Sequence, residues 1–222
     1  MSIVNIAIDG PAGAGKSTIA KSVSKELGFI YVDTGALYRT VGLNALRFGL
    51  NTKSAAEVLP TLENIKVSLR FVGGEQRVFL GDEDVSAAIR QNEVSMAASD
   101  VSAIPEVRAF LFDLQRNIAK ENNCIMDGRD IGTVVLPDAK IKIFLTASAE
   151  ARAERRFKEL REKGQSVDFN VLLEEIKQRD YQDSHREIAP LKQAEDAILV
   201  DTTNVGLEDA INLVLTTVKE RL

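Results

Sequence analysis

Residues 10–17 read Gly-Pro-Ala-Gly-Ala-Gly-Lys-Ser and fit the pattern G-x-x-x-x-G-K-[ST]. An apolar run at 3–8 precedes them and predicts a strand, while apolar residues spaced three and four apart in 16–27 predict a helix. Glycines let a loop in this context curl until successive backbone N–H groups point at one phosphate, and the helix adds the positive end of its dipole. A chance match is the alternative, but a random chain of this length matches less than about once in a hundred. We therefore predict a nucleoside-triphosphate site at this loop.

The same loop predicts its own ligand contacts. Lys16 reaches the β and γ phosphates in such loops, and the Ser17 hydroxyl suits Mg²⁺ as a ligand. The residues that we expect to bind the triphosphate are Gly10, Pro11, Ala12, Gly13, Ala14, Gly15, Lys16, Ser17 and Thr18. The loop alone does not identify the molecule that receives the γ-phosphate.

Short apolar strands alternate with helices along most of the chain. Further strands are predicted at 29–32, 123–126, 141–145 and 197–200. Helices are predicted from about 35 to 48 and at 105–121, 149–163, 168–184 and 207–220. This alternation favours an α/β fold with a parallel sheet covered by helices on both faces. No composition shift marks a second large domain, so we expect a single domain over 1–222.

One β-rich region, from about 63 to 86, interrupts the alternation. Residues 65–72 and 77–80 read IKVSLRFV and RVFL, with Gly73-Gly74-Glu75-Gln76 between them. Apolar and polar residues alternate in the first run, which is typical of a hairpin with one face in water. We predict a small antiparallel insert within the α/β chain.

The composition excludes several classes of protein. The 222 residues are 45% hydrophobic and 27% charged, unlike those of a disordered or collagen-like chain. Cys124 is the one cysteine, so no intrachain disulfide can form and we expect a reducing, cytoplasmic compartment. No apolar run is long enough to span a bilayer, and no positive segment typical of a signal peptide precedes Lys16. The net charge of −5 argues against nucleic-acid binding, and we expect a monomer without nucleic-acid or membrane partners.

Four segments resemble the bacterial cytidylate kinases, which are P-loop nucleoside-monophosphate kinases. They are residues 8–18 (IDGPAGAGKST), 33–39 (DTGALYR), 127–132 (DGRDIG) and 177–190 (KQRDYQDSHREIAP). The resemblance covers nearly the whole chain, including the antiparallel insert. It implies a P-loop kinase-type sheet, an insert near the monophosphate site and a helical lid at about 150–165. It also implies ATP-dependent phosphorylation of CMP and dCMP, with Mg²⁺, in pyrimidine nucleotide metabolism.

Basic residues follow two of the predicted strands. Arg39 follows the second and Arg129 the third, beyond the carboxyl ends where ligands of open α/β sheets bind. Arginine offers a planar fork to phosphate oxygens. The resemblance implies that Arg39, Arg129 and Arg186 bind the acceptor phosphate. The CMP-binding residues that it implies in full are Thr34, Arg39, Ser99, Arg108, Arg129, Asp130, Arg179, Asp183 and Arg186.

The resemblance implies that three of these residues, Ser99, Arg108 and Asp130, recognise the base, and their chemistry suits cytosine. A carboxylate such as Asp130 can accept a hydrogen bond from the N4 amino group, and Arg108 can donate to the ring acceptors. Uracil would face the carboxylate with a second acceptor, and a buried polar site can reject such a mismatch by up to roughly 10⁴-fold. Without the resemblance, Ser99 is interpreted as a helix-surface serine and Arg108 as an exposed helical charge.

A stripe in 168–186 changes from apolar to charged while it stays on one helical face. Its members are Leu172, Ile176, Arg179, Asp183 and Arg186. The charges are either solvated where the helix runs past the core, or they form a wall of the monophosphate pocket, as the resemblance implies. The resemblance places Arg179 and Asp183 near the sugar.

Three arginines, Arg152, Arg155 and Arg156, share one face of the helix predicted at 149–163. Such a run is either a wet face or, as the resemblance implies, part of a mobile lid that neutralises the phosphoryl group in transit. The sequence does not decide which of the three acts; Arg152 and Arg156 join Lys16 and Arg129 as candidate catalytic residues.

Carboxylates end the first three strands of the predicted sheet. Asp33 and Asp127 can each hold Mg²⁺ through water, together with Ser17, and the sequence does not decide between them. Asp9 ends the first strand and can instead brace the loop.

No general base is needed for this reaction, because a phosphate acceptor is largely dianionic near neutral pH. His185, the only histidine, is predicted at the surface, and Cys124 is predicted as a small buried apolar residue. The alternatives are a P-loop kinase for another small acceptor, such as UMP, AMP or a shikimate-like molecule, and a GTP-driven switch. A switch would need an Asn-Lys-x-Asp guanine-reading motif, which this sequence lacks.

Overall fold

The computed structural model describes residues 3–72 and 75–222 of the chain. Backbone contacts divide the chain into two compact units. Unit 1 runs up to Tyr31 and resumes from Asn122 to Leu222, and unit 2 comprises Val32–Glu121. The single domain expected over 1–222 stays a prediction, because compact units of this kind need not fold independently.

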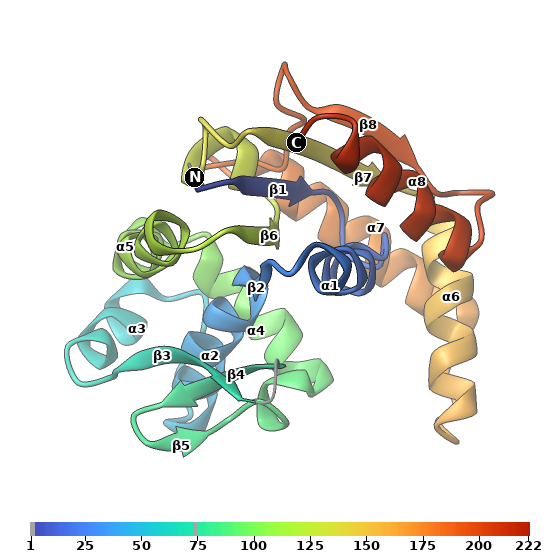
Figure 1. The fold of residues 1–222 in the computed structure, drawn as a ribbon. Coiled ribbons are helices and arrows are strands. Elements are labelled where there is room, and N and C mark those ends of the chain that lie inside the picture. Colours follow the sequence, from blue (N-terminus) through green and yellow to red (C-terminus); the bar gives the residue numbers. More distant parts are fainter. Residues whose placement is uncertain (1–2, 73–74) are drawn as a thin grey trace. The chain divides into compact units, whose positions relative to one another are not determined.

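Unit 1 is built on a five-stranded parallel sheet (Figure 1). The strands in spatial order are β2 (Ile30–Asp33), β6 (Cys124–Gly128), β1 (Asn5–Asp9), β7 (Ile141–Thr146) and β8 (Ile198–Asp201). Strand β2 leaves unit 1 after Tyr31. All five strands coincide with predicted apolar runs, and the predicted parallel sheet is confirmed.

The register of the central strands brings their carboxyl ends to one edge. Ile8 lies opposite Asp127, and Asp9 lies opposite Gly128 of β6 and Phe144 of β7. Strand β1 is buried on both faces, which explains why its centre, Ile6-Ala7-Ile8, is entirely apolar. The loops that follow β1 and β6 therefore start side by side.

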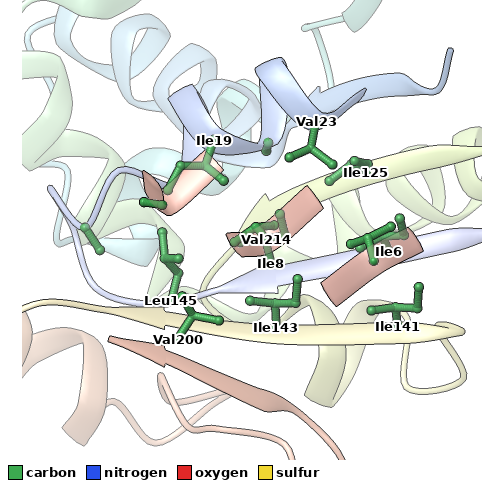
Figure 2. Packing of buried hydrophobic residues seen from close by; sticks show 14 residues of the cluster. Ile6, Ile8, Ile19, Val23, Ile125, Ile141, Ile143, Leu145, Val200 and Val214 are labelled. Atoms are coloured by element: carbon green, nitrogen blue, oxygen red, sulfur yellow. The ribbon is translucent and has the colours of Figure 1, made fainter. Parts of the chain in front are cut away.

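Helices α1 (Lys16–Leu27) and α8 (Leu207–Lys219) pack against each other and against the sheet. Figure 2 shows Ile19 and Val23 of α1 together with Val214 of α8 and the strand isoleucines. The three-and-four spacing of the helical apolar residues places them on one buried face. Helices α6 (Ala149–Glu162) and α7 (Phe169–His185) also pack together, and a π-helical turn, η2 (Ile131–Val135), follows β6.

Unit 2 is mainly helical. Its helical elements are α2 (Thr34–Arg47), α3 (Ala55–Leu62), the 3-10 turn η1 (Ala88–Arg90), α4 (Asn92–Ser102) and α5 (Pro105–Glu121). The sequence predicts only α2 and α5 among them. Helix α3 is short and contains Pro60, and α4 buries small residues such as Ala97, which lies close against Gly42 of α2. Neither helix has the large apolar stripe that identifies a helix from sequence.

The antiparallel insert predicted at about 63–86 is confirmed. It consists of β3 (Val67–Val72), β4 (Glu75–Leu80) and β5 (Glu83–Asp84), in that spatial order. Val78 and Val85 pack with Ala36 and Leu43 of α2. The predicted turn residues Gly73 and Gly74 lie outside the described residues, and the short strand β5 is not predicted from sequence.

Within residues 3–72 and 75–222, no helix has both the length and the apolar character needed to cross a membrane.

The backbone of the phosphate loop lies directly against β7 at Gly10. Its φ is +149°, and a Cβ atom added there would lie 1.9 Å from the carbonyl oxygen of Leu145. A contact of that length with a backbone atom cannot be relieved by a side-chain movement. Position 10 therefore requires glycine for two reasons: a Cβ atom has no room there, and the positive φ disfavours other residues.

We expect Gly10→Ala to lower the free energy of unfolding by about 3 kcal/mol or more, because the loop must move away from β7. Gly28→Ala is the matched control, since Gly28 also has a positive φ of +68° but has open space around its Cα. The control should cost about 1 kcal/mol. Urea unfolding measures both values, and equal losses would contradict the close approach.

Candidate active site

The phosphate loop connects β1 to α1 at the carboxyl edge of the sheet. Gly15 precedes α1 in the left-handed conformation, with a φ of +94°, and no side chain caps the helix there. The first N–H groups of a helix have no partners within it and suit an anion. The predicted loop between a strand and a helix is thus present.

The Lys16 ammonium group lies buried against this loop, with 6% of the residue exposed. Its Nζ donates a hydrogen bond to the Pro11 carbonyl at 2.8 Å. Burial, together with the positive charge of Arg129, lowers the pKa of Lys16 to about 7, although nearby carboxylates led by Asp127 oppose the shift. A lysine in these surroundings gains strongly from an incoming anion.

Ser17 and Asp127 form a second polar contact at the same edge. The Ser17 Oγ donates to Asp127 Oδ2 at 2.9 Å, and the Tyr31 hydroxyl donates to Asp127 Oδ1 at 2.9 Å. Two of the predicted metal ligands therefore touch each other within unit 1. Sequence reasoning missed Tyr31, although its place in the second strand, two residues before Asp33, could have pointed to it.

Asp9 braces the segment that follows β6. Its two carboxylate oxygens accept the backbone N–H groups of Ile131 and Gly132, each at 2.7 Å. Burial raises the pKa of Asp9 to about 6, against the effect of these two hydrogen bonds. Asp9 thus fixes the start of η2, directly after the predicted ligands Arg129 and Asp130.

Two ion pairs join predicted acceptor residues in unit 1. Arg129 Nε donates to Asp183 Oδ2 at 2.7 Å, and Arg186 Nη2 lies 3.4 Å from Asp130 Oδ1. Asp183 is 5% exposed, and the side chains of Arg186 and Asp130 are also buried. The interpretation of this stripe as solvated is therefore wrong for Asp183 and Arg186.

The pKa of Asp183 is lowered by the arginines around its carboxyl group. Burial by itself would raise the pKa of its carboxyl group. The charge and hydrogen bond of Arg129, with the charges of Arg179 and Arg186, outweigh burial and hold that pKa below its usual value. Asp183 is therefore an ionised group in the fold, held between cations.

The three arginines of α6 have different surroundings. Arg152 is 3% exposed and donates to the Ala12 carbonyl and to Asp180, a residue that sequence reasoning missed. Arg156 pairs with Glu159 at 2.8 Å on the surface of the same helix. Arg155 donates to the Thr202 carbonyl. The interpretation of the run as a wet face is therefore wrong for Arg152.

In unit 2, Asp33 directly precedes α2 and lies close to two guanidinium groups. Its Oδ1 accepts the Ala36 N–H at 3.0 Å, which caps the helix directly before the buried Thr34. Its Oδ2 lies 3.8 Å from Arg39 Nη1 and 3.0 Å from Arg90 Nη2. Sequence reasoning missed Arg90, which lies in the short turn η1 and belongs to no motif.

The predicted base readers of unit 2 lie on α4 and α5. Arg108 is 8% exposed, so its interpretation as an exposed charge is wrong. Its Nη1 donates to the Ser102 carbonyl at 3.5 Å, and its guanidinium lies 5.7 Å from the centre of the Tyr38 ring. The Ser102 hydroxyl donates to the Ser99 carbonyl at 2.8 Å, which links the two predicted readers.

The predicted positions of His185 at the surface and of Cys124 in the core are confirmed. His185 is exposed, and its ring stacks on Tyr181 at a centroid distance of 3.9 Å. Cys124 is fully buried in β6, and burial raises the pKa of its thiol to about 12. Neither residue has the surroundings of a general base or a nucleophile.

Comparison with known proteins agrees with this geometry. The family model described as cytidylate kinase matches residues 6–220. The chain belongs to the cytidylate kinase family. A cytidylate kinase of Caldicellulosiruptor saccharolyticus is 55% identical over 97% of this chain and 95% of its own length. A cytidylate kinase of Streptococcus pyogenes serotype M18 is 55% identical over 96% of this chain and 95% of its own length.

Solved structures with much lower sequence identity share the fold. The shikimate kinase from Bacteroides thetaiotaomicron is 13% identical, with a TM-score of 0.50 over 97% of this chain and 98% of that one. An uncharacterized protein from Eubacterium ventriosum is 13% identical, with a TM-score of 0.55 over 98% and 99%. At this identity the likeness concerns the kinase-type arrangement of sheet and helices, as predicted.

The Arg129–Asp183 pair, in which Asp183 is buried and Arg129 is part-buried, gives a test of this cytidylate kinase fold that needs no ligand. We expect Asp183→Asn to lower the free energy of unfolding by about 2 kcal/mol at pH 7, because the guanidinium of Arg129 then loses its charge-assisted hydrogen bond. The pKa of Asp183 is held below 3.8, so its contribution is complete above that pH and is lost as the pH falls further.

The difference between the wild type and Asp183→Asn should therefore shrink in acid, which urea unfolding at several pH values measures. Glu175→Gln, an exposed change on the same helix, is the control and should have little effect at any pH. A loss for Asp183→Asn that does not change with pH would contradict the ion pair.

Proposed function

We propose that this chain transfers the γ-phosphoryl group of ATP to CMP and dCMP, forming CDP and dCDP. Membership of the cytidylate kinase family supports both substrates and the reaction. The observation that carries the assignment of residues is the buried Lys16, whose pKa responds to the charge of Arg129. A cation for the donor phosphates and a cation for the acceptor phosphate thus act on each other within unit 1.

ATP is held by residues 10–18 in this proposal. Backbone N–H groups of the loop and of the first turn of α1 bind the phosphates, and the helix dipole favours their charge. Lys16 exchanges its hydrogen bond to the Pro11 carbonyl for the β and γ phosphate oxygens. The negative charge of the phosphates raises the pKa of Lys16, so a proton is taken up as ATP binds.

Ser17 and Asp127 fit a Mg²⁺ ion, because a hydroxyl and a carboxylate that already lie 2.9 Å apart are ligands of the kind this ion prefers. Mg²⁺ supplies charge neutralisation at the transferring phosphates. Tyr31 orients the Asp127 carboxylate. We assign the ion to Asp127 rather than Asp33, since the Asp33 carboxylate caps α2 and pairs with guanidinium groups in unit 2.

The acceptor phosphate is assigned to Arg39, Arg129 and Arg186, with Thr34 as a further contact. The sugar is assigned to Arg179 and Asp183. Because Asp183 holds Arg129 at 2.7 Å, sugar and phosphate recognition share one hydrogen-bonded pair. A change at the sugar site is therefore expected to affect the position of the acceptor phosphate as well.

Cytosine is assigned to Ser99, Arg108 and Asp130. Asp130 accepts from the N4 amino group, and Arg108 donates to the ring acceptors. Within unit 1, the ion pair with Arg186 orients the Asp130 carboxylate. Uracil cannot donate at position 4, so the same carboxylate rejects it.

The chemistry needs positioning and charge neutralisation rather than proton transfer. Lys16 and Arg129 act on the donor and acceptor phosphates. Arg156 is the lid arginine that we propose to neutralise the phosphoryl group in transit, because its surface pair with Glu159 costs little to break. Arg152, the other predicted lid arginine, is already engaged by the phosphate loop and Asp180.

The proposal includes a monomeric chain that serves pyrimidine nucleotide metabolism in the cytoplasm. The single cysteine, Cys124, supports a reducing compartment, because such a chain cannot form an intrachain disulfide. Light scattering on the purified protein tests the monomer directly.

The proposed reaction is tested by ADP formation from MgATP with CMP, dCMP, UMP, AMP and shikimate as acceptors. CMP and dCMP should be preferred in kcat/KM. An equal or better value for another acceptor would overturn the assignment of substrate. ADP formation that no acceptor stimulates would favour a nucleotide-driven switch instead.

Lys16→Ala should reduce turnover to background while CMP binding stays largely intact, because the acceptor site does not use Lys16. Calorimetry with CMP and the coupled ADP assay measure the two effects. Lys21→Ala, an exposed change on the same helix, is the matched control and should keep turnover near that of the wild type. Parallel loss of CMP binding in Lys16→Ala would show that the two sites are misassigned.

Asp130→Asn should reduce the preference for CMP over UMP, because the amide can donate to the uracil oxygen where the carboxylate cannot. The ratio of the two kcat/KM values is measured on the same preparation, so partial loss of folded protein cancels. An unchanged ratio would remove Asp130 from base recognition.

A further inference from the structure

The buried guanidinium of Arg152 is the centre of a polar cluster at the phosphate loop, in which the Asp180 side chain is 28% exposed. Its Nε donates to the Ala147 carbonyl at 2.9 Å. Its Nη1 donates to the Ala12 carbonyl and to Asp180 Oδ1, both at 2.9 Å, and its Nη2 donates to Asp180 Oδ2. Two backbone carbonyls and a bidentate carboxylate thus fix the side chain in one plane.

The contact with Ala12 has a direct consequence for the loop. The C=O and N–H of a trans peptide point in opposite directions, and the chain has no cis peptide among its described residues. Holding the Ala12 carbonyl on Arg152 therefore turns the N–H of Gly13 away from Arg152. A loop that binds phosphate depends on the direction of such N–H groups.

The stem of Arg152 supports the same peptide. A Cβ atom added to Gly13 would lie 3.4 Å from the Arg152 Cβ, so the loop backbone packs against the aliphatic part of the side chain. Both ends of the arginine thus contact the loop, through packing and through a hydrogen bond. The guanidinium can hold this position only if its charge is balanced in the buried site.

Asp180 supplies that balance from α7. It lies three residues before Asp183, which holds Arg129 from the same helix. One turn of α7 therefore presents two carboxylates, and each fixes an arginine that belongs to another segment of unit 1. Asp183 has a proposed place in the CMP site, whereas Asp180 has no role in the function proposed above.

We propose that Asp180 is a positioning residue of the ATP site, which acts through Arg152 to fix the direction of the Gly13 N–H in the phosphate loop. The inference rests on the proposed binding of ATP at this loop. Asp180 touches neither substrate; it determines how well the loop is formed before ATP arrives. Its loss should therefore weaken the ATP side of the reaction and spare the CMP side.

The test compares Asp180→Asn, Arg152→Lys and the double variant with the wild type. An asparagine can accept from only one guanidinium nitrogen and would turn its NH₂ group towards the other. We expect Asp180→Asn to raise the KM for MgATP and the Kd of a non-hydrolysable ATP analogue by about tenfold, as for one lost charge-assisted hydrogen bond. The KM for CMP should change by less than about twofold.

A double-mutant cycle shows whether the two residues act as one unit. Arg152→Lys should cause a loss of similar size, and adding Asp180→Asn to it should cost little more. Glu174→Gln is the matched control, because Glu174 lies on the same helix, is exposed and pairs with Lys177 at 3.4 Å. The control should leave both KM values unchanged.

Three results would overturn the inference: additive losses in the cycle, equal increases in the KM for ATP and for CMP, or tighter ATP binding in Asp180→Asn. The last would mean that Asp180 restrains Arg152 instead of positioning it. These outcomes are distinct from failure of the proposed function, because that failure would appear in the wild type as a lack of CMP-dependent ADP formation.

Discussion

The rest of the structure depends on the buried ammonium group of Lys16, which has no carboxylate in hydrogen-bonding contact within the part of the chain that the structure describes. Among the described residues, the hydrogen bond that the structure gives Lys16 Nζ is to the Pro11 carbonyl, and burial takes its pKa down to about 7. Such a group is costly in the empty protein and is satisfied by a polyanion. The phosphate loop can carry it because Gly10 lies against Leu145 and the strand register fixes where the loop begins.

Carboxylates hold the surrounding polar groups in place before any substrate is present. Asp9 fixes the backbone after Arg129 and Asp130, Asp183 fixes the Arg129 side chain, and Asp180 fixes Arg152. Each ion pair loses solvation when it is buried, so the pair as a whole adds little to stability compared with an apolar replacement, although the removal of one partner alone is costly. Its contribution to function is geometric, because a guanidinium that is already oriented loses less entropy when a phosphate binds.

The sequence predicted the parts of the fold that depend on local pattern. The helix over 16–27 and the helix over 105–121 were placed at their observed bounds, because their apolar spacing and flanking residues agree with the tertiary packing. Helix α4 was missed because small residues pack it on α2, and the π-helical turn after Asp130 exists because Asp9 binds its backbone from another strand. Neither cause is local in sequence.

In the candidate site too, local motifs could be recognised from the sequence, whereas tertiary contacts could not. Motifs pointed to Lys16, Ser17, Arg129 and Asp183, whose residue types suit the proposed chemistry. They could not show that Arg129 pairs with Asp183 across 54 positions, or that Tyr31, Arg90 and Asp180 support the motif residues. These residues are recognised by their contacts with the motif residues, and such contacts leave no pattern in the sequence.

Proton uptake on ATP binding measures the central relation between the buried lysine and the phosphates. Calorimetric titration of MgATP at pH 8, in buffers with different ionisation enthalpies, gives the number of protons taken up. A pKa of about 7 for Lys16 in the empty protein predicts uptake of close to one proton at pH 8, falling towards zero below about pH 6. Binding of MgATP at pH 8 without proton uptake would show that the phosphates do not meet this ammonium group.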